Sequence, residues 1–211
     1  MQKNTSIKSL FATVLFTCAF TQNASAARVV ETVNPFPAYK IYRQAPDELI
    51  CWAAAAKSVL KMYDPSNRDS VCQMVSKVRN LDCCLPGDGI KEECNKAGFV
   101  QNVYAKYNFA YYESNVDFER VYRELKAGRL VNMIINVAIS RNETRMGHVN
   151  TIYKAERLKK GAIRFYVGDS SGVNWYSFDS DDVKLRSDGR WTYSSLAASF
   201  TLEKFLIVLP K

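Results

Sequence analysis

The chain has 211 residues, of which 47% are hydrophobic, and a formal net charge of +8 at pH 7. That hydrophobic share supports a packed core, which excludes a disordered or low-complexity protein. Its Lys and Arg residues are scattered, with no run longer than Lys159-Lys160, so a dedicated nucleic-acid-binding stripe is excluded as well. We expect no nucleic acid among its partners.

The chain begins with the pattern of an export signal. Lys3 and Lys8 precede the apolar run from Leu10 to Phe16, and Ala24-Ser25-Ala26 provides small residues for cleavage. The apolar stretch then gives way to polar residues, well short of the about 20 apolar residues that a membrane-spanning helix needs. We therefore expect cleavage of this segment rather than stable membrane insertion.

The predicted organisation is a cleaved signal peptide over 1–26, which includes Cys18, and one domain over 27–211. Loss of the two signal lysines lowers the formal charge from +8 to +6, because no acidic residue is lost with them. The mature protein is expected to be secreted or periplasmic. The signal leaves open whether its destination is the periplasm, the medium or another cell.

The first part of the mature chain is predicted to be helical after an extended lead-in. Residues 27–46 contain three prolines and little periodicity, which indicates an extended segment on the surface. Asp117 is expected to cap the last helix of this part and Gly128 to end it. Helical spacing of apolar residues predicts three helices and one shorter turn, over Ile50–Tyr63, Asp69 or Ser70–Val78, a turn through Cys94 ending near Gly98, and 118–125.

The later part of the chain changes to the composition and spacing of strands. Lys159-Lys160-Gly161 supplies the turn between the second and third of them. Helices first and strands later are typical of an α+β fold, with a cleft between a helical half and an antiparallel sheet. The five predicted strands are Leu130–Val137, Val149–Tyr153, Ile163–Val167, Trp175–Phe178 and Phe205–Leu209.

Five cysteines remain after the predicted cleavage, and an odd number leaves one thiol unpaired in an exported protein. Cys72, Cys83, Cys84 and Cys94 are clustered, which makes Cys51 the natural free thiol. Because adjacent cysteines are poorly placed to bond each other, Cys83 and Cys84 are each expected to bond one of the other two, in either order. A four-cysteine zinc site is the alternative; an oxidising compartment and the lack of a Cys-x2-Cys pair argue against it.

Cys51 and His148 form the only candidate nucleophile–base pair, because the chain has a single histidine. Cys51 opens an Ala-rich helix, where unpaired backbone N–H groups and the positive end of the helix dipole favour a thiolate. The alternative is that Cys51 is a small buried hydrophobic residue. His148 follows Gly147 at the expected entrance to a strand.

Three further residues complete the candidate site. Asp169 ends the following strand, and antiparallel pairing is expected to place it near His148, where it would orient the ring; its alternative role is that of a turn aspartate. Asn150 is a weaker substitute for that role. The Gln44 amide and the Cys51 backbone N–H can together donate to an oxyanion.

In identity and order these residues resemble the papain-like cysteine peptidases, particularly their small bacterial secreted and effector branch. The resemblance covers about residues 40 to 180. Two departures are an interval from Gln44 to Cys51 that is one residue longer than in plant and lysosomal papains, and Asp169 in place of an asparagine. The matching segments are Gln44, Cys51-Trp52-Ala53-Ala54, Cys83-Cys84 with Cys94-Asn95, Gly128-Arg129, Gly147-His148-Val149 and Asp169.

The resemblance implies a papain-like fold, in which substrate lies extended between the helical half and a twisted sheet. It implies Cys51 as nucleophile, His148 as general base and then acid, Asp169 as the orienting group and Gln44 in the oxyanion hole. The function expected is that of an exported cysteine peptidase or amidase that acts through a thioester on Cys51. No cofactor and no metal ion is expected.

Several alternatives stay open from the sequence. The same residues suit a peptidoglycan stem-peptide amidopeptidase, or a Cys-His-Asp acyl transferase that differs only in its acceptor. From another class, a secreted binding or toxin-like module would keep Cys51 as a structural residue and use its Tyr and Phe side chains as an interaction surface. We expect a monomer with a protein or peptide substrate; peptidoglycan peptides and a cognate inhibitor or immunity protein are open as partners.

Overall fold

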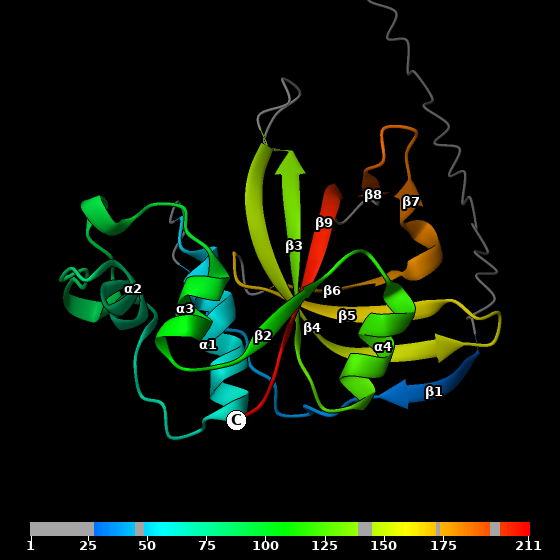
Figure 1. The fold of residues 1–211 in the computed structure, drawn as a ribbon, viewed down its shortest axis with the longest axis horizontal. Helices are drawn as coiled ribbons and strands as arrows, with labels where there is room; N and C mark the ends of the chain where they lie inside the picture. Colours follow the sequence, from blue (N-terminus) through cyan, green and yellow to red (C-terminus); the bar gives the residue numbers. More distant parts are fainter. Residues whose placement is uncertain (1–27, 45–48, 139–144, 172–173, 195–198) are drawn as a thin grey trace, which may run out of the picture.

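The computed structural model describes residues 28–44, 49–138, 145–171, 174–194 and 199–211. The signal peptide predicted over 1–26 lies outside these residues, so its cleavage stays a prediction. Within the described residues the fold is α+β, with four α-helices and one large curled antiparallel sheet (Figure 1). In the same part of the chain, no helix is both long enough and apolar enough to cross a membrane.

Three of the four α-helices were predicted from the sequence, and their ends have clear causes. Ser70 and Gln73 form a capping box at the second helix, and Asp117 accepts a hydrogen bond from the Arg120 N–H at the fourth. The third helix was not predicted. The α-helices are α1 (Cys51–Tyr63), α2 (Val71–Arg79), α3 (Val100–Lys106) and α4 (Phe118–Lys126), with short 3-10 turns at Pro86–Asp88, Glu92–Cys94 and Ser180–Asp182.

All strand pairs in the sheet are antiparallel, in the order β6-β5-β4-β3-β9-β8-β7. Two more strands lie off this path, because β1 pairs with β4 and β2 pairs with β9. The strands are β1 (Val29–Val33), β2 (Tyr111–Ser114), β3 (Val131–Ala138), β4 (Arg145–Leu158), β5 (Ile163–Asp169), β6 (Asn174–Asp179), β7 (Lys184–Leu185), β8 (Trp191–Ser194) and β9 (Ser199–Val208).

The expectations for the lead-in segment and for the strand at Val149–Tyr153 were wrong. The lead-in is not a purely surface segment, because β1 adds to the sheet beside β4, and Phe36 and Tyr39 after it are buried. β4 is much longer than the predicted Val149–Tyr153, since its first half pairs with β3 up to Ala138 opposite Arg145. His148 therefore lies inside β4 and not at its entrance.

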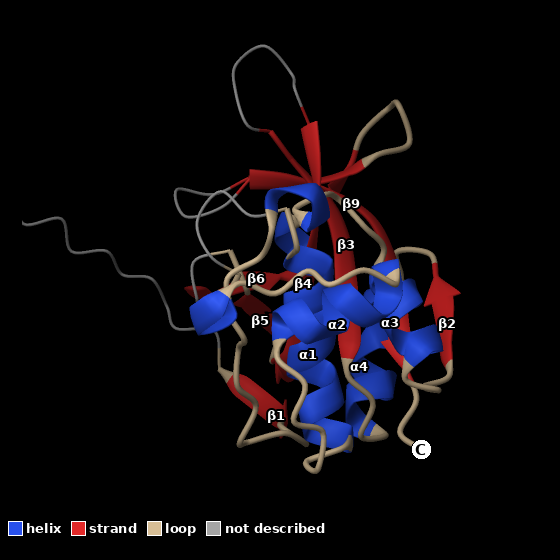
Figure 2. Cartoon of the chain, turned by 90° about the vertical axis from the view of Figure 1, so that its left-hand side faces the viewer, coloured by secondary structure: helices blue, strands red, loops and turns tan. Residues whose placement is uncertain are grey.

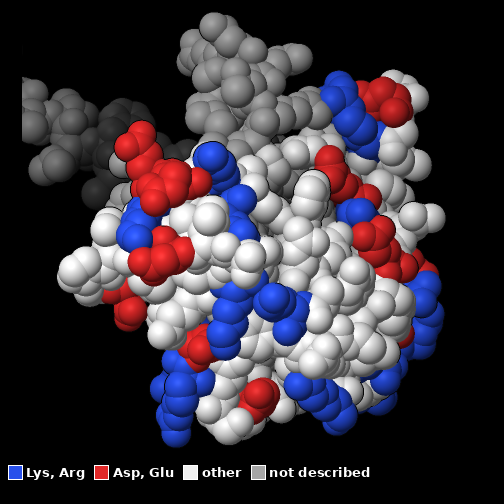
Figure 3. Space-filling model, turned by 60° about the vertical axis from the view of Figure 1, so that its left-hand side comes forward, with Lys and Arg blue, Asp and Glu red and all other residues white. Residues whose placement is uncertain are grey.

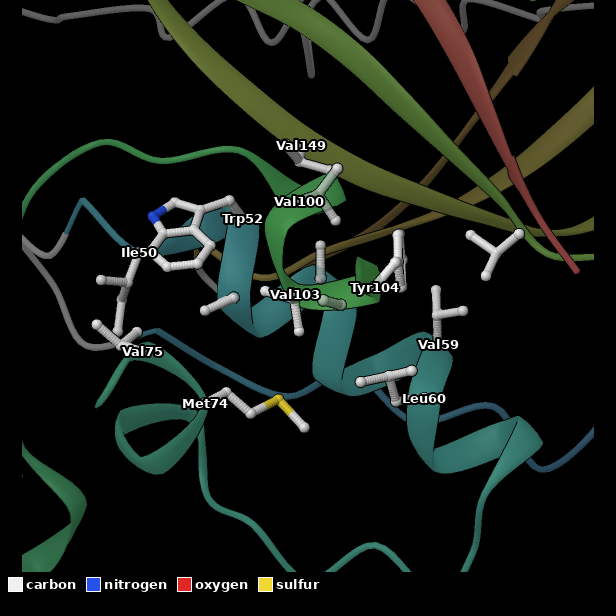
Figure 4. Close-up of a cluster of buried hydrophobic side chains, with 14 of the residues drawn as sticks. Ile50, Trp52, Val59, Leu60, Met74, Val75, Val100, Val103, Tyr104 and Val149 are labelled. Atoms are coloured by element: carbon white, nitrogen blue, oxygen red, sulfur yellow. The ribbon is translucent and has the colours of Figure 1, made fainter. Parts of the chain in front are cut away.

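Helices cover both faces of the sheet and divide the core in two. Figure 1 shows α1, α2 and α3 together, with α4 apart from them, and Figure 2 shows α1 and α2 in front of β3 and β4. One cluster joins the first three helices to one sheet face; it includes Trp52, Met74, Tyr104 and Val149 (Figure 4). The second joins α4 to the opposite face through residues such as Leu125, which is fully buried.

Polar contacts fasten the α1–α3 group to the sheet. The Tyr63 hydroxyl at the end of α1 accepts a hydrogen bond from the Leu130 N–H at 2.5 Å and lies 3.3 Å from the Val208 carbonyl oxygen. Tyr104 of α3 donates to the Asn132 side chain, whose amide in turn donates to Thr151 at 3.0 Å. These contacts fix the positions of α1 and α3 relative to β3 and β4, where the candidate site lies.

Candidate active site

Cys51 is the first residue of α1, and the composition of that helix brings it against the sheet. Ala53, Ala54 and Ala56 are fully buried, and their small side chains allow α1 to pack closely on β4. Among the described residues Cys51 is the one free cysteine, and 8% of its surface is exposed. The thiol predicted to be left over from disulfide pairing is thus free.

The other four cysteines are joined in two disulfides. Cys72 bonds Cys84 and Cys83 bonds Cys94, which settles the order that the sequence left open. All four sulfur atoms are used in these bonds, so the four-cysteine zinc alternative has no thiolate ligands. The two bonds hold the loop after α2 against the helix and against the turn at Glu92–Cys94.

His148 and Asp169 meet across neighbouring strands, as predicted. In the register of β4 and β5, Asn150 lies opposite Asp169, so His148, two residues earlier on the same face, is its diagonal neighbour. The His148 Nε2 atom lies 2.8 Å from the Asp169 Oδ1 atom. That oxygen also accepts hydrogen bonds from the Ser171 N–H and hydroxyl, both at 2.8 Å. Ser171 therefore holds the carboxylate in place for the ring.

The environment of His148 favours its protonated form. Burial alone lowers the pKa of His148, but hydrogen bonds to Asp169 and Cys51 and the negative charges on both outweigh burial and raise the pKa to about 10. Burial acts in the opposite direction on Asp169, yet the His148 and Ser171 contacts keep the pKa of that carboxyl below its usual range. With Nε2 engaged by Asp169, the Nδ1 atom is the one left for Cys51.

Asn150 does not act as the substitute that the sequence allowed. Its side-chain amide donates a hydrogen bond to the Tyr176 hydroxyl at 2.8 Å, and the residue is 1% exposed. Asp169 supplies the contact to His148, while the Asn150 amide links β4 to β6 across β5.

Gln44 reaches the site from the lead-in segment. Its backbone N–H donates to the Ser170 carbonyl at 3.1 Å, which ties this segment to the end of β5 beside Asp169. The residue is buried and lines the same pocket as Cys51 and His148. The longer interval between Gln44 and Cys51 therefore still brings both residues to one place. The sequence has Asp47 and Glu48 shortly before α1, and both lie outside the described residues.

A pocket of about 350 Å³ is lined by Gln44, Cys51 and His148. Its walls come from the start of α1, the segment before α3, and strands β3, β4 and β9, so it lies between the α1–α3 group and the sheet. Most of the lining is apolar, with a charged edge at Glu203 and Lys204 of β9. The remaining lining residues are Leu49, Trp52, Ala97, Gly98, Phe99, Val100, Gln101, Ile134, Gly147 and Val149.

Most of these wall residues were not recognised from the sequence. Phe99 is 69% exposed although it is a large apolar side chain, and Leu49 is 37% exposed. Exposed apolar side chains next to a reactive group are a usual sign of a binding site. The exposure of such a side chain cannot be predicted from the sequence, because it depends on which helices and strands pack over it in the folded protein.

The charged side chains do not gather into one stripe on the side of the molecule that carries the helices. Figure 3 shows basic and acidic residues interspersed there, around uncharged surface. Several of them are paired; Lys77 contacts Asp69 at 2.5 Å and Lys204 contacts Glu113 at 2.9 Å. This distribution agrees with the scattered charges of the sequence.

The chain was compared with known protein families and structures. No family model matches it, and no curated protein matches it. Among solved structures it is similar to Xylellain, a cysteine protease from Xylella fastidiosa, with a TM-score of 0.45 and 11% sequence identity. That match covers 88% of this chain and 88% of the other.

Proposed function

We propose that this protein is a papain-like cysteine peptidase or amidase, which hydrolyses peptide or amide bonds through a thioester on Cys51. One observation carries the proposal: the free Cys51, His148 and Gln44 line one pocket, and His148 is paired with Asp169. The order of the motifs in the chain supports the same reading. The raised pKa of His148, to which Cys51 contributes beside Asp169, supports an ion pair between the thiol and the ring.

The chemistry follows from the contacts of these residues. The Cys51 thiolate attacks the carbonyl carbon, and the electron pair of the C=O bond moves to the oxygen, where the Gln44 amide and the Cys51 backbone N–H donate to it. The intermediate then collapses as the C–N bond breaks. His148 gives its proton to the leaving amine, and the acyl group remains on sulfur as a thioester.

Deacylation returns the enzyme to its starting state. Water attacks the thioester, neutral His148 takes a proton from that water, and the C–S bond breaks to release the acid and the Cys51 thiolate. Asp169 keeps the ring in one orientation throughout and stabilises its positive charge. A transferase would differ only in using another amine in place of water.

We further propose that the protein works after export, as the signal pattern over 1–26 indicates. The two disulfides support this, because such bonds persist in oxidising compartments outside the cytosol. The substrate is expected to be a protein or peptide, and peptidoglycan stem peptides are an alternative of the same bond type.

The proposal is tested first by alkylation of Cys51 with iodoacetamide across a pH range. Rapid labelling at pH 7 is expected, and His148→Ala should slow it about tenfold or more, because an ordinary thiol is only a few per cent ionised there. Lys154→Ala, on the same strand but paired with Glu156 outside the pocket, is the matched control. An inert Cys51, or labelling that ignores His148, would contradict the mechanism.

Activity assays then separate the substrates. Casein, purified peptidoglycan and an amine-acceptor assay, each with Cys51→Ala as the blank, are expected to show hydrolysis of the first. Cleavage of peptidoglycan alone would point to the amidopeptidase, and amine transfer without hydrolysis to the transferase. No activity on any of the three, with an unreactive thiol, would favour the binding module.

A further inference from the structure

The pocket wall beside Cys51 is a segment without regular secondary structure. This wall, residues 95–98, lies between the turn at Glu92–Cys94 and Phe99, which directly precedes α3, and its Ala97 and Gly98 line the pocket. A wall without helix or strand hydrogen bonds needs other contacts to hold its shape. At its start the Asn95 side chain accepts a hydrogen bond from the Leu49 N–H at 2.6 Å, and the Lys96 N–H donates to the Cys94 carbonyl at 2.9 Å. Two side chains outside the segment bind its carbonyls nearer the pocket.

Arg79, the last residue of α2, supplies two of the three side-chain hydrogen bonds to these carbonyls in the described part of the chain. Its Nη2 atom donates to the Lys96 carbonyl at 2.7 Å and to the Ala97 carbonyl at 3.2 Å. The guanidinium also lies over the Trp52 ring, 5.6 Å from its centroid. Only arginine combines several donors in one plane with a flat face that stacks on an aromatic ring.

Trp52 is the second contact, and it adjoins Cys51 in the chain. Its indole N–H donates to the same Lys96 carbonyl at 3.3 Å, and the side chain is 1% exposed. Gly98 lies directly on the indole, because a Cβ atom at this position would come within 2.5 Å of the ring. The wall therefore packs directly against Trp52, with no room for a side chain at position 98.

We propose that Arg79 is a positioning residue for the reaction at Cys51. Arg79 binds the Lys96 and Ala97 carbonyls and the Trp52 ring at the same time. It thereby fixes the position of the pocket wall relative to Cys51, and so the position of an extended substrate that lies along this wall. Arg79 does not line the pocket, so it acts through the wall and not by touching substrate. This inference rests on the proposed function, because it assigns a role within the same site.

The experiment compares Arg79→Met with Lys77→Met, which removes a cation from the same helix. Lys77 pairs with Asp69 and lies over Tyr107, away from the pocket. Arg79→Met is expected to lower kcat/KM on a peptide substrate about ten- to a hundredfold, mainly through KM, since a displaced wall misplaces the substrate. Lys77→Met should leave both constants within about twofold, as surface ion pairs contribute little.

Two further variants and one activity-independent measurement sharpen the test. Arg79→Lys keeps the positive charge but has only one compact donor group. Its KM is therefore expected to lie between the KM of the wild type and that of Arg79→Met. Gly98→Ala displaces the wall without changing charge and should raise KM as well. Hydrogen exchange at the backbone amides of 96–101 is expected to be faster in Arg79→Met and unchanged in Lys77→Met, in protein that still unfolds cooperatively.

The outcomes distinguish this inference from the function on which it rests. If the wild type hydrolyses peptides and Arg79→Met keeps its KM, the positioning role is overturned while the function stands. The role is equally overturned if kcat falls with KM unchanged, or if Lys77→Met has the same effect as Arg79→Met. If the wild type hydrolyses nothing and its Cys51 is inert, the proposed function itself fails, and the role in catalysis fails with it.

Discussion

At His148 two opposing effects act on one imidazole. Burial disfavours the charged ring, while the carboxylate of Asp169 and the sulfur of Cys51 favour it, and the second effect wins because both partners are within hydrogen-bond reach. The folded-state pKa of about 10 lies above the ordinary value of 6.5. The pair therefore stabilises the fold fully below about pH 6.5, and this stabilisation is lost as the pH rises toward 10.

Asp169→Asn tests this balance. The asparagine amide can still accept a hydrogen bond from the His148 ring. Because the substitution removes the negative charge, the pKa of His148 should fall. We expect the alkaline limb of kcat/KM to move to lower pH, because the imidazolium that protonates the leaving amine is lost earlier. The measurement is the pH profile of peptide hydrolysis.

Asp182→Asn provides the control, since this exposed carboxyl lies in the 3-10 turn at Ser180–Asp182 and not in the pocket. Its profile should match the wild type. An alkaline limb that stays in place in Asp169→Asn would show that the carboxylate does not set the charge of His148.

The elements around the site differ in whether their own sequence favours their structure. α1 and α2 carry their own signals in Ala content and in the capping box of Ser70 and Gln73, and both were predicted. The segment from Cys83 to Gly98 has no such signals; within it, the structure describes two short 3-10 turns and one isolated bridge, between Cys84 and Ile90. Covalent bonds hold this segment in place of periodic hydrogen bonds: Cys83–Cys94 lies within it, and Cys72–Cys84 ties it to α2.

Removal of the Cys83–Cys94 disulfide in a Cys83→Ala/Cys94→Ala variant tests that role. The residues are 11 apart, so the loss of the cross-link is expected to lower the free energy of unfolding by about 3 kcal/mol, as measured by urea denaturation. KM should rise as well, because Cys94 directly precedes the wall at 95–98.

The Cys72→Ala/Cys84→Ala variant is the matched comparison, with a separation of 12 residues. Its loss of stability should be similar, but its KM should change less, since neither cysteine adjoins the wall. Equal effects of the two variants on KM would argue that the loop is one rigid unit.

At the scale of the whole molecule, the site depends on how the α1–α3 group sits on the sheet. Cys51 belongs to the helical group, and His148 and Asp169 belong to the sheet. A shift between these two parts would separate the proposed nucleophile from its proposed base. Tyr63 bridges the two parts, since it accepts from the Leu130 N–H at 2.5 Å and lies beside the Val208 carbonyl. Leu130 and Val208 are fully buried, so few other partners could replace this hydroxyl.

Tyr63→Phe is therefore expected to destabilise the protein by about 1–3 kcal/mol, because the Leu130 N–H loses its partner away from water. Thermal or urea unfolding measures the change. Tyr111→Phe, at a tyrosine that is 38% exposed, should change stability by about 0.5 kcal/mol or less. If both variants unfold alike, Tyr63 does not fasten the two parts.

Much of the fold and the centre of the site could be predicted from the sequence, and the omissions have physical reasons. β1, β2, β7 and β8 were missed because strands of two to five residues at the margins of a sheet are fixed by their partners and not by their own alternation. α3 was missed although Val100, Val103 and Tyr104 are buried at helical spacing, because it has only seven residues.

By itself the sequence determined which chemistry was available: one histidine, one cysteine left over from pairing, and an aspartate at the end of the strand after His148. These follow from residue types and local periodicity, which do not depend on packing. Only the tertiary structure decided the disulfide order, the choice of Asp169 over Asn150, and the contact of Arg79 with the wall. Such contacts join residues distant in the chain, and their geometry arises only when buried faces pack together.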